Sequence, residues 1–557
     1  MTAKIFSPQR TPSAQRKIFV FFVPFVVQFG LWPMPRYGLM MKKIFFCLIS
    51  VLILSPQLLA QKYVAVNGSD SNSGTLGQPF KTITKAIAVA VPGDTIFVRG
   101  GIHPQTGTIN IASNQNGTQS LRYHLVAYRA ERPLLDFSST PLGRKGINLS
   151  ASYWHLKGLD VKGAGDNGLE INGGSFNIIE NCAFFENRDS GVQLSNGAAN
   201  NRLLNCDSYF NADPPDYADA DGFAPKLTVG SGNYFYGCRA WGNCDDGWDG
   251  YKRGANNVTT TLENCWTWKN GYLKNGSDPG PQANGNGFKM GGGDNGNSDQ
   301  LMHHFVLKNC LAFSNKAKGF DQNNNVGSMT LLNCTGYNNK ETNYRLTRAL
   351  NAGQILTVKN SISFAGAVEL GAFAIQEKNG WMSPFAVTAA DFLSLADSVA
   401  ASPRQADGSL PNIDFLHLAR NSDLIDAGVE VGLPFNGKAP DLGAFESDFA
   451  TAVEREKFMV PANFQLAQNY PNPFSPLGRG TFGNPATTIK FATPRNSLVR
   501  IGLYNVLGEE VMKLVDEEKP AGQYQLTVHA QNLPGGIYFY TLRAGNFSQT
   551  KKMLLVR

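Results

Sequence analysis

The first 60 residues of this 557-residue chain contain no aspartate or glutamate. They carry seven basic residues, a number equal to the net charge of +7: Lys4, Arg10, Arg16, Lys17, Arg36, Lys42 and Lys43. From Gln61 onward, the other 43 basic residues balance the 43 acidic ones. A balanced mature chain has no general attraction for polyanions, so no nucleic-acid partner is expected.

Long apolar runs are also scarce. One run spans residues 18–27 and another spans residues 44–54, and both are too short to cross a bilayer. The second follows two lysines and precedes the small residue Ala60, which is the arrangement of a secretory signal. We therefore expect an over-extended N-terminus over residues 1–40 and a signal peptide over residues 41–60. The mature protein should be secreted or attached to the cell surface, without a membrane span.

Several common catalytic arrangements are missing as well. The seven histidines show no metal-ligand spacing, and the chain has no zinc motif, no Ser-His-Asp arrangement and no glycine-rich phosphate loop. These absences argue against zinc enzymes, serine hydrolases and nucleotide-binding enzymes. Carboxylates and basic side chains remain as the candidates for chemistry.

Six of the eight cysteines occupy one position of a repeated motif, in which Asn or Gly precedes the cysteine, an aromatic residue lies three positions after it and Asn lies five after it. The motif recurs at Cys182, Cys206, Cys238, Cys265, Cys310 and Cys334, and a seventh copy has Ser361 in this place. Steps of 24 to 32 residues, with one of 45, are the period of a stacked solenoid. Short strands alternate with loops and no helical period occurs, so the repeat predicts an all-β fold, a parallel β-helix over residues 61–446.

Stacked coils place equivalent residues above one another as ladders. We expect the cysteines to be inert buried thiols rather than disulfides or metal ligands. The aromatic residues of the repeat, such as Trp241 and Trp268, should stack as core rather than serve as sugar platforms. An amphipathic helix over residues 80–90 should cap the first coil, and the segment 424–445 should close the solenoid.

The last 95 residues, 463–557, follow a polar linker over 447–462 and alternate apolar and polar positions, as in a small antiparallel β-sandwich. Their elements Asn472-Pro-Phe474, Tyr504-Asn-Val-Leu-Gly508 and Pro534-Gly-Gly-Ile-Tyr-Phe-Tyr540 resemble the C-terminal sorting domain of the Bacteroidota type IX secretion system. The resemblance implies the type IX secretion machinery as a partner. A carbohydrate-binding module is the alternative.

A second position of the repeat holds a polar residue that is followed by glycine and then by an apolar strand residue. Aligning on this glycine places Asp221 and Asp246 on successive coils, about 5 Å apart at Cα, with Asp245 and Asp249 in the same short segment. Carboxylates this close repel each other unless a proton or a cation intervenes, and an all-oxygen set favours a hard cation such as Ca²⁺. A structural calcium clip or a hydrated acidic turn remains an alternative.

Two residues past the aligned glycine, the register gives Asp249, then Lys289, then Asp321. Lys289 should therefore lie one coil from Asp249 and face the same way. A surface salt bridge is the ordinary explanation for a single lysine. The neighbouring acidic patch and the glycines that follow, which leave room for a ligand, make a chemical role the stronger interpretation.

The segments Asp219-Ala-Asp221-Gly-Phe-Ala-Pro-Lys226, Asp245-Asp-Gly-Trp-Asp249 and Asn286-Gly-Phe-Lys289 together resemble polysaccharide lyase family 9, the calcium-dependent pectate lyases on a right-handed β-helix. The likeness spans roughly residues 61–446. It implies Ca²⁺ ligands at Asp221, Asp245, Asp246 and Asp249 and a Brønsted base at Lys289. It further implies β-elimination on an acidic polysaccharide such as polygalacturonate or pectin, with an alkaline optimum because the base must be unprotonated.

Two other functions stay open at this point. A β-helix glycoside hydrolase acting on pectin needs paired carboxylates but no essential lysine or metal, and a calcium-stabilised surface adhesin needs no catalysis. A monomer is expected in each case. Five further cations are candidates for binding substrate carboxylates, each with a solvated side chain as the alternative: Lys226, Lys252, Arg253, Arg345 and Arg348.

Overall fold

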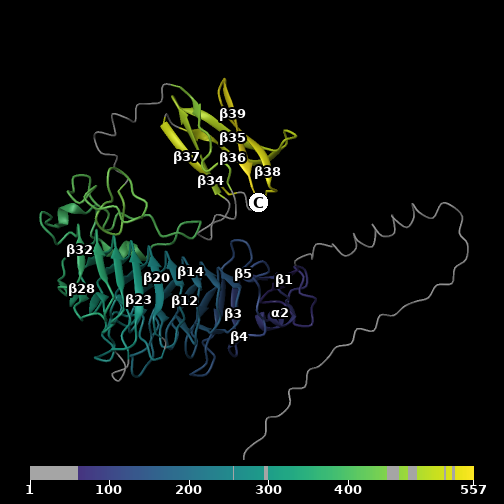
Figure 1. The fold of residues 1–557 in the computed structure, drawn as a ribbon. Coiled ribbons are helices and arrows are strands. Elements are labelled where there is room, and N and C mark those ends of the chain that lie inside the picture. Colours follow the sequence, from purple (N-terminus) through teal and green to yellow (C-terminus); the bar gives the residue numbers. More distant parts are fainter. Residues whose placement is uncertain are drawn as a thin grey trace, which may run out of the picture. The chain divides into compact units, whose positions relative to one another are not determined.

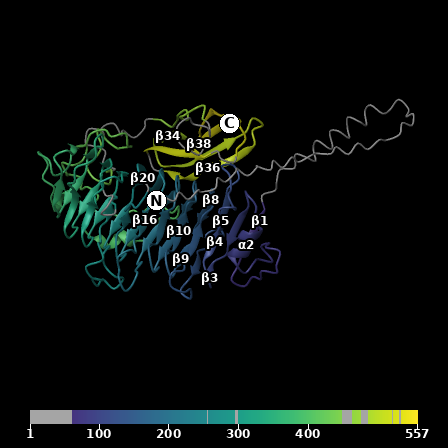
Figure 2. The same ribbon diagram turned by 60° about the horizontal axis from the view of Figure 1, so that its bottom comes forward.

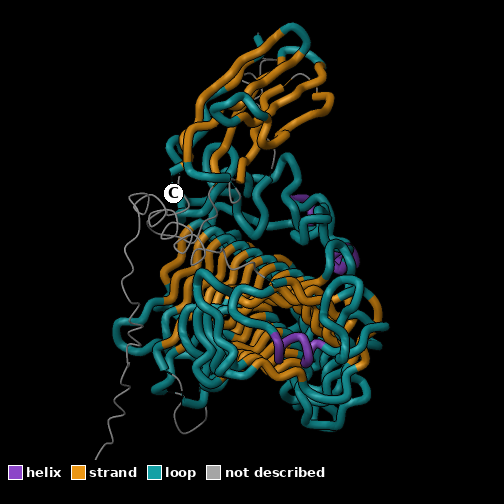
Figure 3. Tube along the Cα trace, turned by 90° about the vertical axis from the view of Figure 1, so that its right-hand side faces the viewer, coloured by secondary structure: helices purple, strands orange, loops and turns teal. Residues whose placement is uncertain are grey.

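The computed structural model describes residues 60–254, 256–293, 299–447, 463–474, 486–519, 522–529 and 533–556 (Figure 1). The expected N-terminal extension, the signal peptide up to Leu59 and most of the linker lie outside these residues. From Gln61 to Glu377 the chain winds through coils of three short strands, and the strands of successive coils pair in parallel (Figure 3). This right-handed parallel β-helix confirms the predicted fold.

The coils build three long parallel sheets, here called sheets 1, 2 and 3 in the order in which each coil visits them. Sheet 1 contains β1 (Gln61–Val64), β2 (Thr95–Val98), β5 (Tyr123–Ala127), β8 (Trp154–Lys157), β11 (Ile178–Glu180), β14 (Arg202–Leu204), β17 (Asn233–Tyr236), β20 (Val258–Glu263), β23 (His303–Lys308), β26 (Met329–Leu332), β29 (Leu356–Lys359) and β32 (Ile375–Glu377). Sheet 2 contains β3 (Gly101–Pro104), β6 (Pro133–Asp136), β9 (Asp160–Lys162), β12 (Ala183–Phe185), β15 (Asp207–Tyr209), β18 (Arg239–Trp241), β21 (Trp266–Trp268), β24 (Leu311–Phe313), β27 (Thr335–Tyr337) and β30 (Ile362–Phe364). Sheet 3 contains β4 (Ile109–Ile111), β7 (Ile147–Leu149), β10 (Leu169–Asn172), β13 (Val192–Ser195), β16 (Phe223–Pro225), β19 (Trp248–Asp249), β22 (Phe288–Lys289), β25 (Lys318–Asp321), β28 (Thr342–Leu346) and β31 (Val368–Leu370).

The turn from sheet 1 to sheet 2 explains the asparagine and cysteine of the repeat. The residue before each cysteine has a positive φ, such as 53° at Asn205 and 54° at Asn264, and Gly237 takes the same place in one coil. Asparagine and glycine tolerate this left-handed conformation better than other residues. The seven cysteines among the described residues are all free and buried, which confirms the interpretation as inert thiols.

The bend from sheet 2 to sheet 3 carries a ladder of buried asparagines. Each side-chain amide donates to the Oδ1 of the next asparagine at 2.8–3.0 Å: Asn187, Asn211, Asn243, Asn270, Asn315, Asn339 and Asn343. The column of glycines that follows is required by close packing. A Cβ on Gly247 would lie 2.0 Å from Thr267 Oγ1 and 2.6 Å from the carbonyl oxygen of Gly287. This tight bend holds the start of each sheet 3 strand in register.

The aromatic column stacks as predicted but lies outside the coils. Neighbouring ring centroids from Phe185 through Tyr209, Trp241 and Trp268 to Phe313 are 4.3–5.4 Å apart. In a three-residue strand the middle side chain points inward, so its two neighbours face outward. The segment 389–445, which contains the 3₁₀ turns η1 (Ala389–Asp391) and η2 (Asp397–Ala401), forms a second core with the later part of this column, Trp241, Trp268 and Phe313. The part over 424–445, expected to close the solenoid, therefore packs along the outer face of sheet 2.

The first coil is covered by α2 (Ile83–Val89), which lies beside β1 at the N-terminal end of the stack (Figures 1 and 2). Ile83, Ala86 and Ile87 face the core, and Thr82 caps the helix by accepting a hydrogen bond from the backbone N–H of Lys85. The helix begins three residues later than expected because Phe80 is hydrogen-bonded as a strand residue to Tyr63 and Ala65. Among the described residues, no helix is long and apolar enough to cross a membrane.

The C-terminal unit has two antiparallel sheets around its own core, as predicted for a small sandwich. One sheet contains β33 (Gln465–Leu466), β34 (Ala486–Thr493) and β37 (Gly522–His529). The other contains β36 (Glu510–Lys519), β35 (Ser497–Tyr504), β38 (Gly536–Ala544) and β39 (Phe547–Leu555).

Candidate metal and active site

Three aspartates meet where sheet 3 begins in the coils of β16 and β19. Asp221 precedes β16, and Asp245 and Asp246 precede β19. Each contributes a carboxylate oxygen to a group whose members all lie within 4.8 Å of one another, and all three side chains are buried. The parallel pairing of Phe223 with Trp248 confirms that Asp221 and Asp246 lie on successive coils.

Local hydrogen bonds hold each carboxylate in place. Asp221 Oδ2 accepts from Ser190 Oγ at 3.1 Å, and Asp245 Oδ1 accepts from the backbone N–H of Asn284 at 2.5 Å. Asp246 Oδ1 accepts from the backbone and side chain of Asn286 at 2.7 and 2.9 Å. These bonds orient the aspartates from neighbouring coils, so the arrangement is built into the bend.

Two observations show that the donor set fits a hard cation. Asp246 Oδ2 is buried and its contact is an ion pair with Lys289 Nζ at 3.0 Å, so three buried carboxylates share few balancing cations. Burial raises the pKa of Asp221, Asp245 and Asp246, and the neighbouring carboxylates raise it further, while nearby lysines partly offset this effect. Ionised carboxylates crowded in this way are stabilised by a multivalent cation, and the all-oxygen set matches Ca²⁺.

Lys289 lies beside this cluster, as its position in the repeat predicts. Asp249 and Lys289 are direct partners in the pairing of β19 with β22, and Asp321 follows Lys289 one coil further on. Lys289 Nζ is 3.0 Å from Asp246 Oδ2 and 3.4 Å from Asp249 Oδ1. Burial opposes the charge on Lys289, but the surrounding carboxylates outweigh burial and raise its pKa well above the ordinary value.

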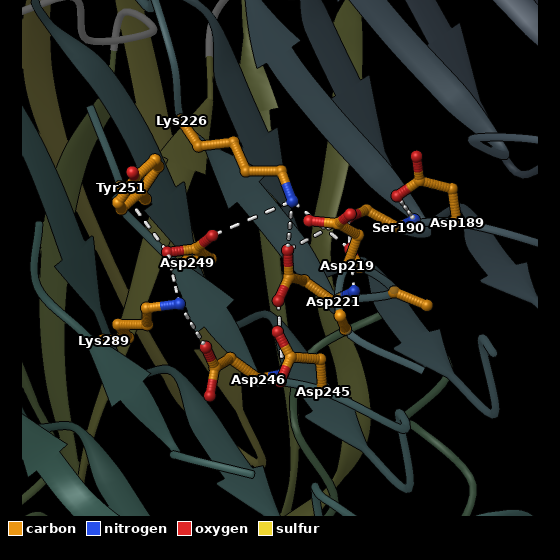
Figure 4. Close-up of polar contacts among 12 residues, drawn as sticks. Asp189, Ser190, Asp219, Asp221, Lys226, Asp245, Asp246, Asp249, Tyr251 and Lys289 are labelled. Carbon is orange, nitrogen blue, oxygen red and sulfur yellow. Dashed lines mark hydrogen bonds and ion pairs between the residues drawn. The ribbon is translucent and has the colours of Figure 1, made fainter. Parts of the chain in front are cut away.

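A second lysine enters the cluster from the opposite side (Figure 4). Lys226 Nζ lies 2.8 Å from Asp221 Oδ2 and 3.8 Å from Asp249 Oδ2, and its side chain is buried. Burial alone would lower the pKa of Lys226, yet Asp221 and Asp249 raise it overall. Asp249 thus lies between two ammonium groups.

The other cations proposed from the sequence lie elsewhere. Lys252 is buried and donates to the carbonyl oxygen of Val229 at 3.3 Å, and burial lowers its pKa to about 7. Arg345 follows Asp321 one coil further along sheet 3 and pairs with Glu369 at 3.4 Å. Arg348 forms an ion pair with Asp299.

Sequence reasoning missed the residues that support the aspartates. Ser190 and Asn286 occupy the same position before the repeat glycine as Asp221 and Asp246, so the column itself contained the signal. Asn284 lies at the end of a long insertion, outside any repeat position, and only the folded chain shows its contact with Asp245.

The chain is similar to known proteins over both of its parts. The family described as the Pel9A-like, right-handed β-helix region matches residues 62–360, and the secretion system C-terminal sorting domain matches residues 469–556. Pectate lyase L of Dickeya chrysanthemi is 38% identical over 394 residues, which cover 69% of this chain and 90% of that protein. Pectate lyase L of Paenibacillus polymyxa is 40% identical over 393 residues, which cover 66% of this chain and 84% of that protein. The crystal structure of pectate lyase Pel9A matches with a TM-score of 0.64 and 35% identity, covering 70% of this chain and 96% of that one.

Proposed function

Since the chain belongs to the Pel9A-like right-handed β-helix family and is a polysaccharide lyase, we propose that it cleaves pectate-type polyuronate by β-elimination. In this proposal Lys289 is the base. Ca²⁺ is held by Asp221, Asp245, Asp246 and Asp249.

One observation carries the proposal, namely a buried lysine amine that lies 3.0 Å from a carboxylate oxygen of Asp246, within a cluster of three buried aspartates. Lys289 is a potential proton acceptor, and the three buried aspartates beside it are a potential cation-binding set. These are the two parts that proton removal next to a carboxylate requires.

The chain's own residues would bind, orient and deprotonate the substrate. The aspartates hold the cation with oxygens fixed by Ser190, Asn284 and Asn286. Bound Ca²⁺ supplies positive charge that neutralises the aspartates and the C6 carboxylate of the uronate, which lowers the pKa of Lys289 and stabilises the charge that develops at C5. Neutral Lys289 can then accept the C5 proton.

The reaction balances without any further cofactor. The C5–H bond breaks and its proton moves to Lys289 Nζ, while its electron pair forms the C4–C5 double bond. The C4–O bond breaks, and the leaving oxygen takes a proton from water. The hydroxide that remains takes the proton from Lys289 Nζ, which restores the neutral base. One chain end becomes an unsaturated uronate and the other keeps a free hydroxyl group.

The test is the ultraviolet absorbance of the unsaturated uronate, followed with the full chain and polygalacturonate. Absorbance should rise with Ca²⁺ present, stop when a chelator is added and resume when Ca²⁺ is restored. No rise on polygalacturonate at saturating Ca²⁺ would refute the proposal.

The same assay separates the two alternatives. A hydrolase would release reducing ends without any absorbance and would be indifferent to the chelator. An adhesin would bind the polymer and give neither signal.

A further inference from the structure

Two long insertions in the repeat meet at one groove beside the candidate site. Residues 210–222 connect β15 with β16, and residues 269–287 connect β21 with β22. Together with the bend after β12 they line an open groove of about 680 Å³. This volume falls within the range of about 300–1,000 Å³ typical of ligand sites.

The walls of this groove combine cations with aromatic rings. Arg188, Phe210, Tyr217 and Lys274 all line it. Lys274 reaches back across the bends, pairs with Glu186 and lies 5.6 Å from the Phe210 ring. Arg188 is exposed, and within the described part of the chain its guanidinium has no hydrogen-bond or ion-pair partner.

The backbone at the aromatic walls is unusual. Tyr217 has a φ of 58°, a left-handed conformation that bulky side chains rarely adopt, whereas the φ of 57° at Phe210 belongs to a turn that recurs in other coils. Such conformations persist where the surrounding fold enforces them and are often functional. The rings are thereby held on the wall of the groove.

The stretches of chain that line the groove also supply groups that hold the carboxylate cluster. Arg188 lies two residues before Ser190, whose hydroxyl donates to Asp221. The long insertion that supplies Lys274 ends at Asn284, which donates to Asp245. The coil of Arg188 is three coils from that of Lys289, a separation of about 14 Å along the stack.

Resting on the proposed function, we propose that this groove is a distal subsite for the acidic polysaccharide, binding uronate residues several sugars away from the cleaved bond. The Arg188 guanidinium provides two parallel donors for a uronate carboxylate. Tyr217 and Phe210 provide flat apolar surfaces for the sugar ring. The two insertions thus extend the binding cleft toward the N-terminal end of the stack.

The test compares a long polymer with a short substrate. The full chain with Ca²⁺ is assayed on polygalacturonate and on trigalacturonate, as wild type, Arg188→Ala and Tyr217→Ala. Each substitution should raise KM for the polymer about tenfold, leave kcat within about twofold and leave KM for the trimer unchanged. An unchanged KM for the polymer, or an equal rise for the trimer, would overturn the subsite.

Matched controls are Arg129→Ala and Tyr236→Ala, which remove exposed side chains of the same types from other faces. Both should leave KM unchanged for both substrates. Equal KM changes in controls and groove variants would also overturn the subsite.

A binding measurement separates failure of the subsite from failure of the lyase proposal. Binding of a ten-residue oligogalacturonate is measured by calorimetry in the Lys289→Met background, where no cleavage is expected. Arg188→Ala should weaken this binding about tenfold, whether or not the wild type proves to be a lyase. Undiminished binding would overturn the subsite even if the wild type cleaves pectate.

Discussion

Lys289 is surrounded by groups that compete for its proton. Asp246 and Asp249 lie 3.0 and 3.4 Å from its Nζ and stabilise the ammonium form. A cation on the same carboxylates cancels this stabilisation, so protonation of Lys289 and binding of Ca²⁺ oppose each other. The rise of activity with pH on the acidic side of the optimum therefore depends both on deprotonation of Lys289 and on Ca²⁺ binding.

We predict that raising Ca²⁺ from a limiting to a saturating concentration moves the acid limb of the pH–rate profile to lower pH by about one unit or more. The carboxylates raise the pKa of Lys289, so the neutral base forms only as pH rises. Neutralising these carboxylates lowers that pKa, and the base becomes available at lower pH. Initial rates between pH 6 and 10, at two Ca²⁺ concentrations, measure the shift. A limb that stays fixed or moves to higher pH would contradict the assignment of Lys289.

Asp246 offers a nearly isosteric test of the cation site. In Asp246→Asn the contacts with Asn286 can be kept, because Oδ1 accepts both of them, while the side chain that pairs with Lys289 loses its charge. The Ca²⁺ concentration for half-maximal activity should rise about 10- to 100-fold. Asp216→Asn, an exposed acid on a nearby insertion, is the control and should leave this concentration unchanged. An unchanged calcium requirement in Asp246→Asn would remove this residue from the ligand set.

The bend between sheets 2 and 3 is the element that positions the site. The side chains of its asparagine ladder pack against the glycine column. Loss of one asparagine therefore disturbs the coils that carry Asp246 and Lys289. Asn270 donates to Asn315 Oδ1 at 2.9 Å and to Thr267 Oγ1 at 2.8 Å, and it accepts from Asn243. Its removal leaves several buried partners unsatisfied.

We expect Asn270→Ala to lower the free energy of unfolding by about 2–4 kcal/mol, because each buried unsatisfied group costs about 1–3 kcal/mol. Urea denaturation followed by circular dichroism measures the change. Asn110→Ala, at the exposed start of sheet 3, should shift the midpoint little. Equal midpoints for the two variants would show that the ladder contributes no special stability.

The repeat columns allowed the register of the elements to be predicted from sequence. Because one position of each repeat copy takes a small buried residue, cysteine or serine, and another takes glycine, insertions change the loops and leave the columns aligned. Asp221, Asp246, Asp249 and Lys289 occupy column positions, and their mutual arrangement followed from this alignment.

Features outside the columns were not predictable in the same way. The placement of segment 424–445 on sheet 2 depends on contacts between residues far apart in sequence, such as Ala444 with Thr335. Lys226 was identified as a cation near substrate, but its double contact with Asp221 and Asp249 depends on side-chain conformation. The groove at Arg188 depends on two insertions whose course no periodicity describes.

At the scale of the whole molecule, the chain joins a polysaccharide lyase to a type IX sorting domain, which makes it a secreted or cell-surface protein. The two units have separate hydrophobic cores. The β-helix and its covering segment end by Ser447, and the antiparallel sheets begin with β33 at Gln465. Catalysis and export should therefore be separable.

We predict that a chain ending at Ser447 keeps the activity per mole of the full chain, within about twofold, because the site lies wholly in the first unit. The same truncation should abolish export from a host with a type IX system. The fraction of lyase activity in the medium or on the cell surface measures export, with the full chain as the control. Normal export of the truncated chain would assign the sorting function elsewhere.

The most direct measurement is the rate of unsaturated-uronate formation by Lys289→Met at saturating Ca²⁺. Methionine keeps a long unbranched side chain but has no amine. We predict a fall in kcat of about 10²- to 10⁴-fold, the usual contribution of a general base, and we expect Ca²⁺ to raise Tm equally in the variant and the wild type. Activity within tenfold of the wild type would contradict the assignment of Lys289 as the base and, with it, the proposed mechanism.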